Sequence, residues 1–138
     1  MNKYILNGKS ITDLESLYAE FGRAVNAPEG YFGKSFDSFD DCLFGGFGLE
    51  SPCKIIWEDS GYSKHAMSCK ALEEYCMSVI ENSPFLHKEG FEEGKEWAYS
   101  TLQAAQSGSR TLFNEVVETI RSVPGRASWE HKIELLLE

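Results

Sequence analysis

The spacing of apolar residues along the chain predicts three short strands and four helices. Compact apolar runs predict strands at residues 4–6, 53–58 and 132–137. Apolar residues at helical intervals predict helices over about 12–25, 36–43 and 67–79, and from near 110 to the Pro124-Gly125 pair. Residues 85–108 are harder to interpret, because three glycines and mixed charges leave only a weak helical pattern between Trp97 and Ala105.

Turn and capping residues indicate where these elements begin and end. Asn7-Gly8 is a turn dipeptide after the first strand, and Ser60-Gly61 indicates a turn after the second. Thr12 and Glu15 have the spacing of a capping box for the first helix. Ser35 can cap the second helix, which the Gly45-Gly46 pair should terminate.

Helices, and not tight hairpins, separate the predicted strands. Parallel strands need long crossover connections, which are usually helical. The pattern therefore predicts an α/β fold in which a three-stranded parallel sheet is flanked by about four helices. A length of 138 residues fits one domain, so we expect residues 1–138 to form a single unit.

The composition describes a folded, acidic protein. Hydrophobic residues make up 42% of the chain, and 22 acidic against 13 basic residues give a net charge of −9. This charge disfavours direct nucleic-acid binding, which depends on phosphate contacts. It suits either a cationic partner or solubility, and charge alone does not decide between them. Without an apolar segment that could span a bilayer or direct export, we expect no membrane association and a cytoplasmic location.

Residues that could carry chemistry form no recognisable catalytic or metal-binding motif. The four cysteines contain no C-x-x-C pair, and the three histidines do not stand at zinc-ligand spacings from them: Cys42, Cys53, Cys69, Cys76, His65, His87 and His131. We therefore expect reduced, mostly buried thiols and neither a metal ion nor another cofactor. Phosphate-binding loop and nucleophile-elbow motifs do not occur.

Three aspartates in the second predicted helix form the most informative charge pattern. Asp37, Asp40 and Asp41 stand at i, i+3 and i+4, so their carboxylates should project from one face. Each like-charge pair costs a few tenths of a kcal/mol, and only Asp37 lies in the first turn, where the helix dipole favours a carboxylate. This arrangement fits an interface for a cationic partner, and it also fits a merely solvated polar face.

The residues around these aspartates match a known signature. Residues 28–43 have the sequence PEGYFGKSFDSFDDCL, which closely resembles the barstar family of barnase-type ribonuclease inhibitors. In that family a P-E-x-Y-aromatic-G loop leads into a helix with two aspartates four residues apart, followed by Cys-Leu. The flanking strands and the last helix and strand also agree, so the resemblance covers most of residues 1–60 and 110–138.

The resemblance implies a barstar-like fold and a protein that blocks the active site of a ribonuclease. Asp37 and Asp41 match the two inhibitory aspartates, whose carboxylates would take the positions of RNA phosphates. The other residues that we expect at the partner interface are Tyr31, Gly33, Ser35, Asp40, Gly45 and Glu118. Of these, Gly33 and Gly45 match loop glycines that let the backbone approach the enzyme, and Glu118 matches an additional acidic contact.

Some residues depart from the family pattern. Ser35 stands where the family often has Asn, and both Asp40 and Gly46 replace aromatic residues. The added carboxylate suggests a different or more cationic nuclease. Residues 65–108 are also longer than a minimal barstar needs, and 85–108 are expected to be an insertion particular to this chain.

These observations lead to one main hypothesis and two alternatives. The main hypothesis is a non-enzymatic, cytoplasmic inhibitor of a ribonuclease, serving as the immunity partner of a nuclease toxin. In the first alternative, the barstar scaffold binds a basic protein that is not a nuclease. In the second, the clustered carboxylates belong to an enzyme, although no base, metal motif or nucleophile completes such a site.

Overall fold

The computed structural model describes residues 1–83, 90, 92–127 and 130–138. The chain forms two compact units, one of Met1–Ala66 with Val116–Glu138 and the other of Met67–Glu115. The single domain expected over residues 1–138 therefore stays a prediction, and the two units are described in turn.

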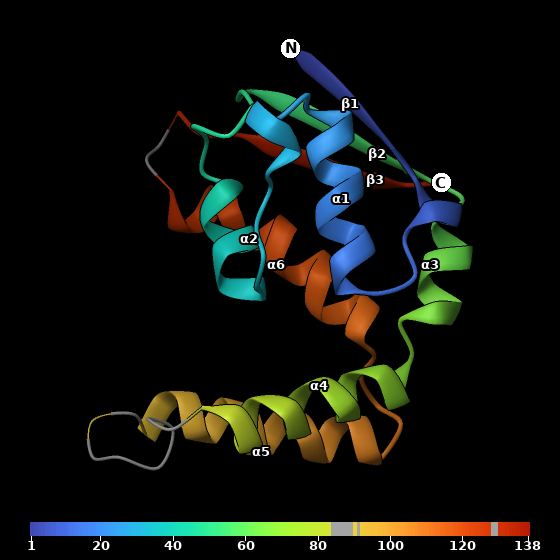
Figure 1. Ribbon diagram of the computed structural model, residues 1–138, viewed down its shortest axis with the longest axis vertical. Coiled ribbons are helices and arrows are strands. Elements are labelled where there is room, and N and C mark those ends of the chain that lie inside the picture. The colour runs from blue at the N-terminus through green and yellow to red at the C-terminus, as the bar shows by residue number, and fades with distance from the viewer. Residues whose placement is uncertain (84–89, 91, 128–129) are drawn as a thin grey trace. The chain divides into compact units, whose positions relative to one another are not determined.

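The first unit contains a three-stranded parallel sheet (Figure 1). Its strands are β1 (Asn2–Asn7), β2 (Cys53–Glu58) and β3 (Ile133–Leu137), in the spatial order β1-β2-β3. Leu6 pairs with Trp57, which pairs in turn with Leu137. The predicted α/β fold with a parallel sheet is confirmed.

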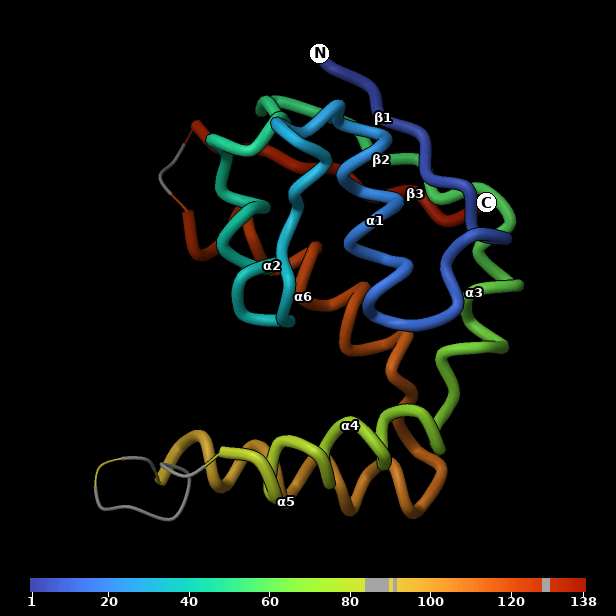
Figure 2. Tube along the Cα trace, in the orientation of Figure 1, coloured from blue at the N-terminus to red at the C-terminus, as the bar shows by residue number. Residues whose placement is uncertain are grey.

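Helices connect these strands, as parallel pairing requires. The first unit contains α1 (Leu14–Ala24), α2 (Phe36–Cys42), α3 (Ser60–Ala66) and most of α6 (Leu112–Arg126). Two short 3₁₀ helices, η1 (Gly8–Ser10) and η2 (Pro28–Gly30), precede α1 and α2. Figure 2 traces the extended connection that leads from α1 through η2 into α2.

Three local predictions for this unit were wrong in detail. The cap of α1 is Asp13 with Ser16, in place of Thr12 with Glu15, because the Asp13 carboxylate accepts from the Ser16 N–H while Ser16 Oγ accepts from the Asp13 N–H. Ser60 starts α3, where a turn was expected, and its N–H and hydroxyl both donate to the Glu138 carbonyl. The last helix continues through Pro124 to Arg126.

The second unit is built around a helical hairpin. Helices α4 (Cys69–Asn82) and α5 (Glu92–Gln106) lie side by side (Figures 1 and 2). The described residues thus contain six α-helices, two more than expected. Residues 84–89 and 91 lie outside the described part of the chain. Of the insertion expected at 85–108, the structure therefore describes only residue 90 and residues 92–108.

Small residues explain why α5 gave only a weak sequence pattern. Its buried positions are Ala98, Thr101 and Ala105, which carry little of the hydrophobicity by which an amphipathic helix is recognised. Tyr75 of α4 contacts Trp97 of α5 edge to face, with ring centroids 6.3 Å apart. Three of the four cysteines are buried and all four are free thiols, as predicted.

A buried hydrogen-bonded chain fastens the end of β1 to β2 and α3. The Trp57 Nε1–H donates to Ser63 Oγ at 3.0 Å, and the Ser63 hydroxyl donates to the Gly8 carbonyl at 2.7 Å. A Cβ atom at Gly8 would collide with the backbone carbonyl oxygens of Glu58 and Asp59. The first turn therefore requires glycine for lack of space.

A buried carboxylate fastens α1 to the same end of β1. Glu20 accepts the Asn7 backbone N–H at 2.6 Å and two hydrogen bonds from Arg23 at 2.8 and 2.6 Å. Burial would raise the pKa of Glu20, but these hydrogen bonds favour the carboxylate, and the pKa lies below its ordinary value. The ionised form of Glu20 thus contributes to stability.

We expect Gly8→Ala to lower the free energy of unfolding by about 1–3 kcal/mol or more, because its methyl group must displace backbone that cannot yield easily. Urea denaturation measures this change. Gly61→Ala is the matched control, since nothing lies within 4 Å of that Cβ position in α3. Equal stabilities for the two variants would contradict the steric argument.

We expect Glu20→Gln to lower the free energy of unfolding at pH 7 by about 1–3 kcal/mol, because charge-assisted hydrogen bonds are lost. Since the folded-state pKa of Glu20 is lowered, its contribution is present above the unfolded-state pKa and lost as pH falls below about 5. The difference between wild type and variant should therefore shrink toward pH 3 in urea titrations. A difference independent of pH would contradict this, and the exposed Glu15→Gln is the control.

Candidate protein-binding site

Helix α2 begins at a reciprocal capping box. Ser35 Oγ accepts the Ser38 N–H at 3.2 Å, while Ser38 Oγ accepts the N–H groups of Ser35 and Lys34, both at 2.9 Å. These bonds satisfy donors that a helix N-terminus otherwise leaves unpaired. The prediction that Ser35 caps this helix is confirmed, and the cap fixes where the aspartates begin.

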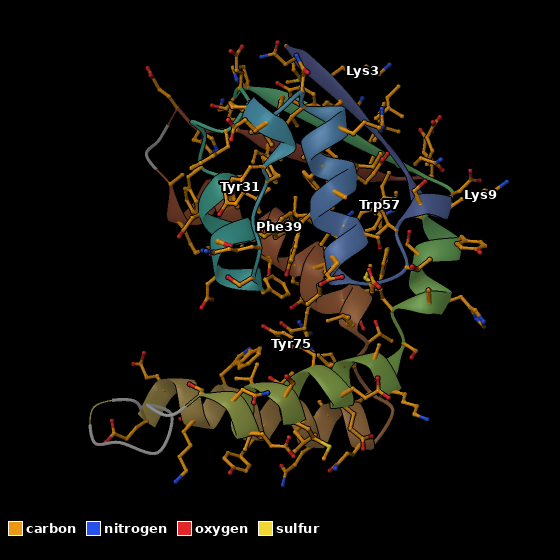
Figure 3. The ribbon with its side chains drawn as sticks, viewed as in Figure 1. Lys3, Lys9, Tyr31, Phe39, Trp57 and Tyr75 are labelled. Atoms are coloured by element: carbon orange, nitrogen blue, oxygen red, sulfur yellow. The ribbon has the colours of Figure 1, made fainter. Side chains whose placement is uncertain are left out.

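Phe39 anchors this short helix to the core. Its side chain is fully buried, and its ring centroid lies 5.1 Å from that of Phe21, 5.5 Å from that of Tyr18 and 5.8 Å from that of Phe32. Figure 3 shows Phe39 between α2 and α1. Aromatic pairs in tilted and edge-to-face geometry add to the stabilisation from burial, so α2 is firmly seated although it has only seven residues.

The two glycines predicted at the interface have different surroundings. Gly33 has a φ of +103°, and a Cβ atom there would lie 2.7 Å from the backbone N and Cα of Phe39. Close packing of the loop on α2 therefore requires this glycine. Gly45 has a φ of +106° and nothing closer than 3.9 Å, so only its backbone conformation requires glycine and its surroundings are open.

Asp37 and Asp41 lie one turn apart on the exposed side of α2. Within the part of the chain that the structure describes, neither carboxylate has a hydrogen-bond or ion-pair partner. Burial raises the pKa of the neighbouring Cys42 thiol, and the Asp41 carboxylate raises it further. Two unpaired negative charges on a seated helix can bind a cationic surface at little conformational cost.

Asp40 differs from the other two aspartates because it already has a partner. Arg126 at the end of α6 forms a bidentate pair with it, donating from Nη1 and Nη2 to the two carboxylate oxygens at 2.8 and 2.6 Å. These hydrogen bonds raise the pKa of Arg126, which stays charged. The charge of Asp40 is thus balanced by Arg126. Among the described residues, α2 therefore presents two unpaired carboxylates where the sequence suggested three.

Exposed aromatic side chains border the aspartates, and sequence reasoning missed two of them. Tyr31, predicted at the interface and labelled in Figure 3, is 38% exposed. Its ring contacts that of Phe47, with centroids 5.7 Å apart. Phe47 and Phe44 are 37% and 36% exposed. Both lie in the glycine-rich segment after α2, where no helical pattern indicates a face, and their aromatic character was the only available signal.

Glu118 lies on α6, about two turns before Arg126, and its side chain is exposed. The other seven predicted residues lie on α2 or on the loops at its two ends. Arg126 and His131 also reach this region, and no local motif pointed to them. His131 Nε2 donates to the Leu43 carbonyl at 2.8 Å, next to the end of α2.

The described residues contain neither a membrane-spanning helix nor a metal-binding cluster. None of the helices there is long and apolar enough to cross a membrane. Over residues 1–83, 90, 92–127 and 130–138, no group of three or more His, Cys, Asp or Glu side chains is arranged to hold a metal ion.

Comparison with known proteins identifies the family of this chain. The family model described as Barstar (barnase inhibitor) matches residues 1–111, a range that contains the loop, α2 and both unpaired aspartates. No curated protein sequence matches the chain. Because the family model covers most of its length, this chain belongs to the barstar family of barnase inhibitors.

Proposed function

We propose that this protein inhibits a barnase-type ribonuclease by inserting Asp37 and Asp41 into the enzyme's cationic active site. Barstar-family proteins are ribonuclease inhibitors and not enzymes, and they bind ribonucleases as protein partners. The observation that carries the proposal is a pair of exposed, unpaired carboxylates one turn apart on a capped and core-anchored helix. An immunity protein that protects its cell from a nuclease toxin requires this kind of surface.

The mechanism follows from the charge on the two surfaces. A ribonuclease must present cationic groups to the phosphates of RNA, and carboxylates on a rigid helix can occupy those positions. Charge-assisted hydrogen bonds from arginine to carboxylate are among the strong ones, especially when they are bidentate. Because Asp37 and Asp41 have no partner among the described residues, their pairing with the enzyme breaks no hydrogen bond or ion pair there, although desolvation and side-chain ordering still oppose it.

The arrangement of Asp40 changes what kind of nuclease the surface favours. Its charge is balanced by Arg126, so this position gives no reason to expect a partner more cationic than usual. The surface around the two unpaired carboxylates also carries the Arg126 guanidinium and exposed aromatic rings. Selection among nucleases should therefore depend on the shape and apolar contacts around the charged centre.

We expect Asp41→Ala to lose most of the inhibition and Asp37→Ala to have the next largest effect, each weakening inhibition by about 30-fold or more. The measurement is steady-state cleavage of a fluorogenic RNA by barnase and other barnase-type ribonucleases, titrated with each variant. Glu134→Ala is the control, because Glu134 is an exposed acid on β3. Two single variants that inhibit as well as wild type would refute the proposed roles.

Salt should weaken the complex mainly by slowing association. Complementary charges raise the association rate constant above the neutral range of about 10⁵–10⁶ M⁻¹s⁻¹, and added salt screens this attraction. Stopped-flow measurements over increasing NaCl should show the rate constant falling toward that range, with a shallower slope for Asp37→Asn combined with Asp41→Asn. An association rate independent of salt would contradict an electrostatic mechanism.

The alternative, in which the scaffold binds a basic protein that is not a nuclease, makes a different prediction for the native partner. Co-purification from the source organism, followed by an RNA-cleavage assay on the recovered partner, distinguishes the two. A partner with nuclease activity that the protein suppresses supports the proposal, and an inactive partner supports the alternative.

A further inference from the structure

Phe44 is a solvent-exposed aromatic residue that follows Asp41 by three positions in the chain. It follows the end of α2 by two residues, and its backbone N–H donates to the Asp41 carbonyl at 3.1 Å. The residue is 36% exposed, so part of its apolar surface is accessible to a partner. Phe44 therefore adds an apolar surface near Asp41, the aspartate from which we expect the largest contribution to inhibition.

Residues from the far end of the chain hold this ring in place. The Arg126 guanidinium carbon lies 5.2 Å from the Phe44 ring centroid, over the ring. The His131 ring is stacked with that of Phe44 at 15°, with centroids 6.0 Å apart, and His131 also donates to the carbonyl of the preceding Leu43. Arg126 is itself fixed by both carboxylate oxygens of Asp40.

These contacts leave the Phe44 side chain little freedom to lose on binding. An exposed side chain that must be ordered by its partner reduces the affinity, whereas a ring already held in one position does not. Phenylalanine, like tyrosine and tryptophan, is enriched at protein interfaces relative to the rest of the surface.

We propose that Phe44 is a specificity-determining contact of the inhibitory surface and that Arg126 is its positioning residue. The inference rests on the proposed ribonuclease inhibition and deepens it. The favoured enzyme has an apolar side chain or a guanidinium plane beside its cationic active site, which the Phe44 ring contacts when Asp37 and Asp41 bind. Ribonucleases with a carboxylate or a short polar side chain at that place are bound more weakly.

The test measures association and dissociation rates with barnase and with other barnase-type ribonucleases for five proteins: wild type, Phe44→Ala, Arg126→Gln, Arg126→Lys and the double variant of Phe44→Ala with Arg126→Gln. Phe44→Ala should speed dissociation about tenfold or more and leave association nearly unchanged. Arg126→Gln leaves Asp40 unpaired and makes the surface more acidic, so association should be equal or faster while dissociation becomes faster. Arg126→Lys, which keeps the charge but not the planar group, should behave like Arg126→Gln in dissociation.

The double variant separates positioning from a general structural role. If Arg126 acts through Phe44, adding Arg126→Gln to Phe44→Ala should change dissociation very little. Tyr62→Ala and Arg121→Gln are the matched controls, an exposed aromatic on α3 and an exposed arginine on α6, and both should bind like wild type. Urea denaturation of every variant identifies any loss of folding.

The possible outcomes distinguish the two proposals. Wild-type protein that inhibits no ribonuclease of the panel overturns the proposed function and this inference with it. Wild-type protein that inhibits, together with a Phe44→Ala variant that dissociates no faster, overturns this inference alone. An Arg126→Gln effect that persists undiminished in the Phe44→Ala background overturns the positioning role.

Discussion

The candidate site depends on the burial of one aromatic side chain, Phe39. Helix α2 has only seven residues, and three of them are aspartates whose mutual repulsion and low helix propensity disfavour the helix. Contacts of Phe39 with three other buried rings offset that cost, and Gly33 brings the preceding loop against the Phe39 backbone. The exposed side of α2 can therefore carry unfavourable charge because its buried side is so firmly packed.

The packing of α2 also places part of the net charge of −9 at one site on the surface. Most of the acidic excess lies away from α2, where it contributes to solubility and to long-range attraction. The three aspartates of α2 differ in their partners. Asp37 and Asp41 are unpaired among the described residues, whereas Asp40 forms an ion pair with Arg126. The surface thus offers a compact dianionic centre, and the guanidinium beside it limits how many cations a partner can place there.

Much of the fold could be predicted because its determinants are local. The three strands, their parallel pairing and the Ser35 cap follow from apolar runs, crossover lengths and hydroxyl capping. Features that depend on context were missed: small buried residues concealed α5, and Ser60 starts a helix because it bonds to the distant Glu138 carbonyl. In the site, the spacing of aspartates predicted their common face, but only the folded chain reveals that Arg126 pairs with Asp40.

The family match covers the predicted interface on α2 but not all of the residues that contact it. The match ends at residue 111, so it contains the loop, α2 and Phe44 but neither Arg126 nor His131. The predicted interface residues on α2 thus lie within the matched segment, whereas Arg126 and His131, which contact the Phe44 ring, lie outside it. If Phe44 contacts the partner as we propose, substitution of Arg126 or His131 changes which ribonuclease is preferred while Asp37 and Asp41 stay the same.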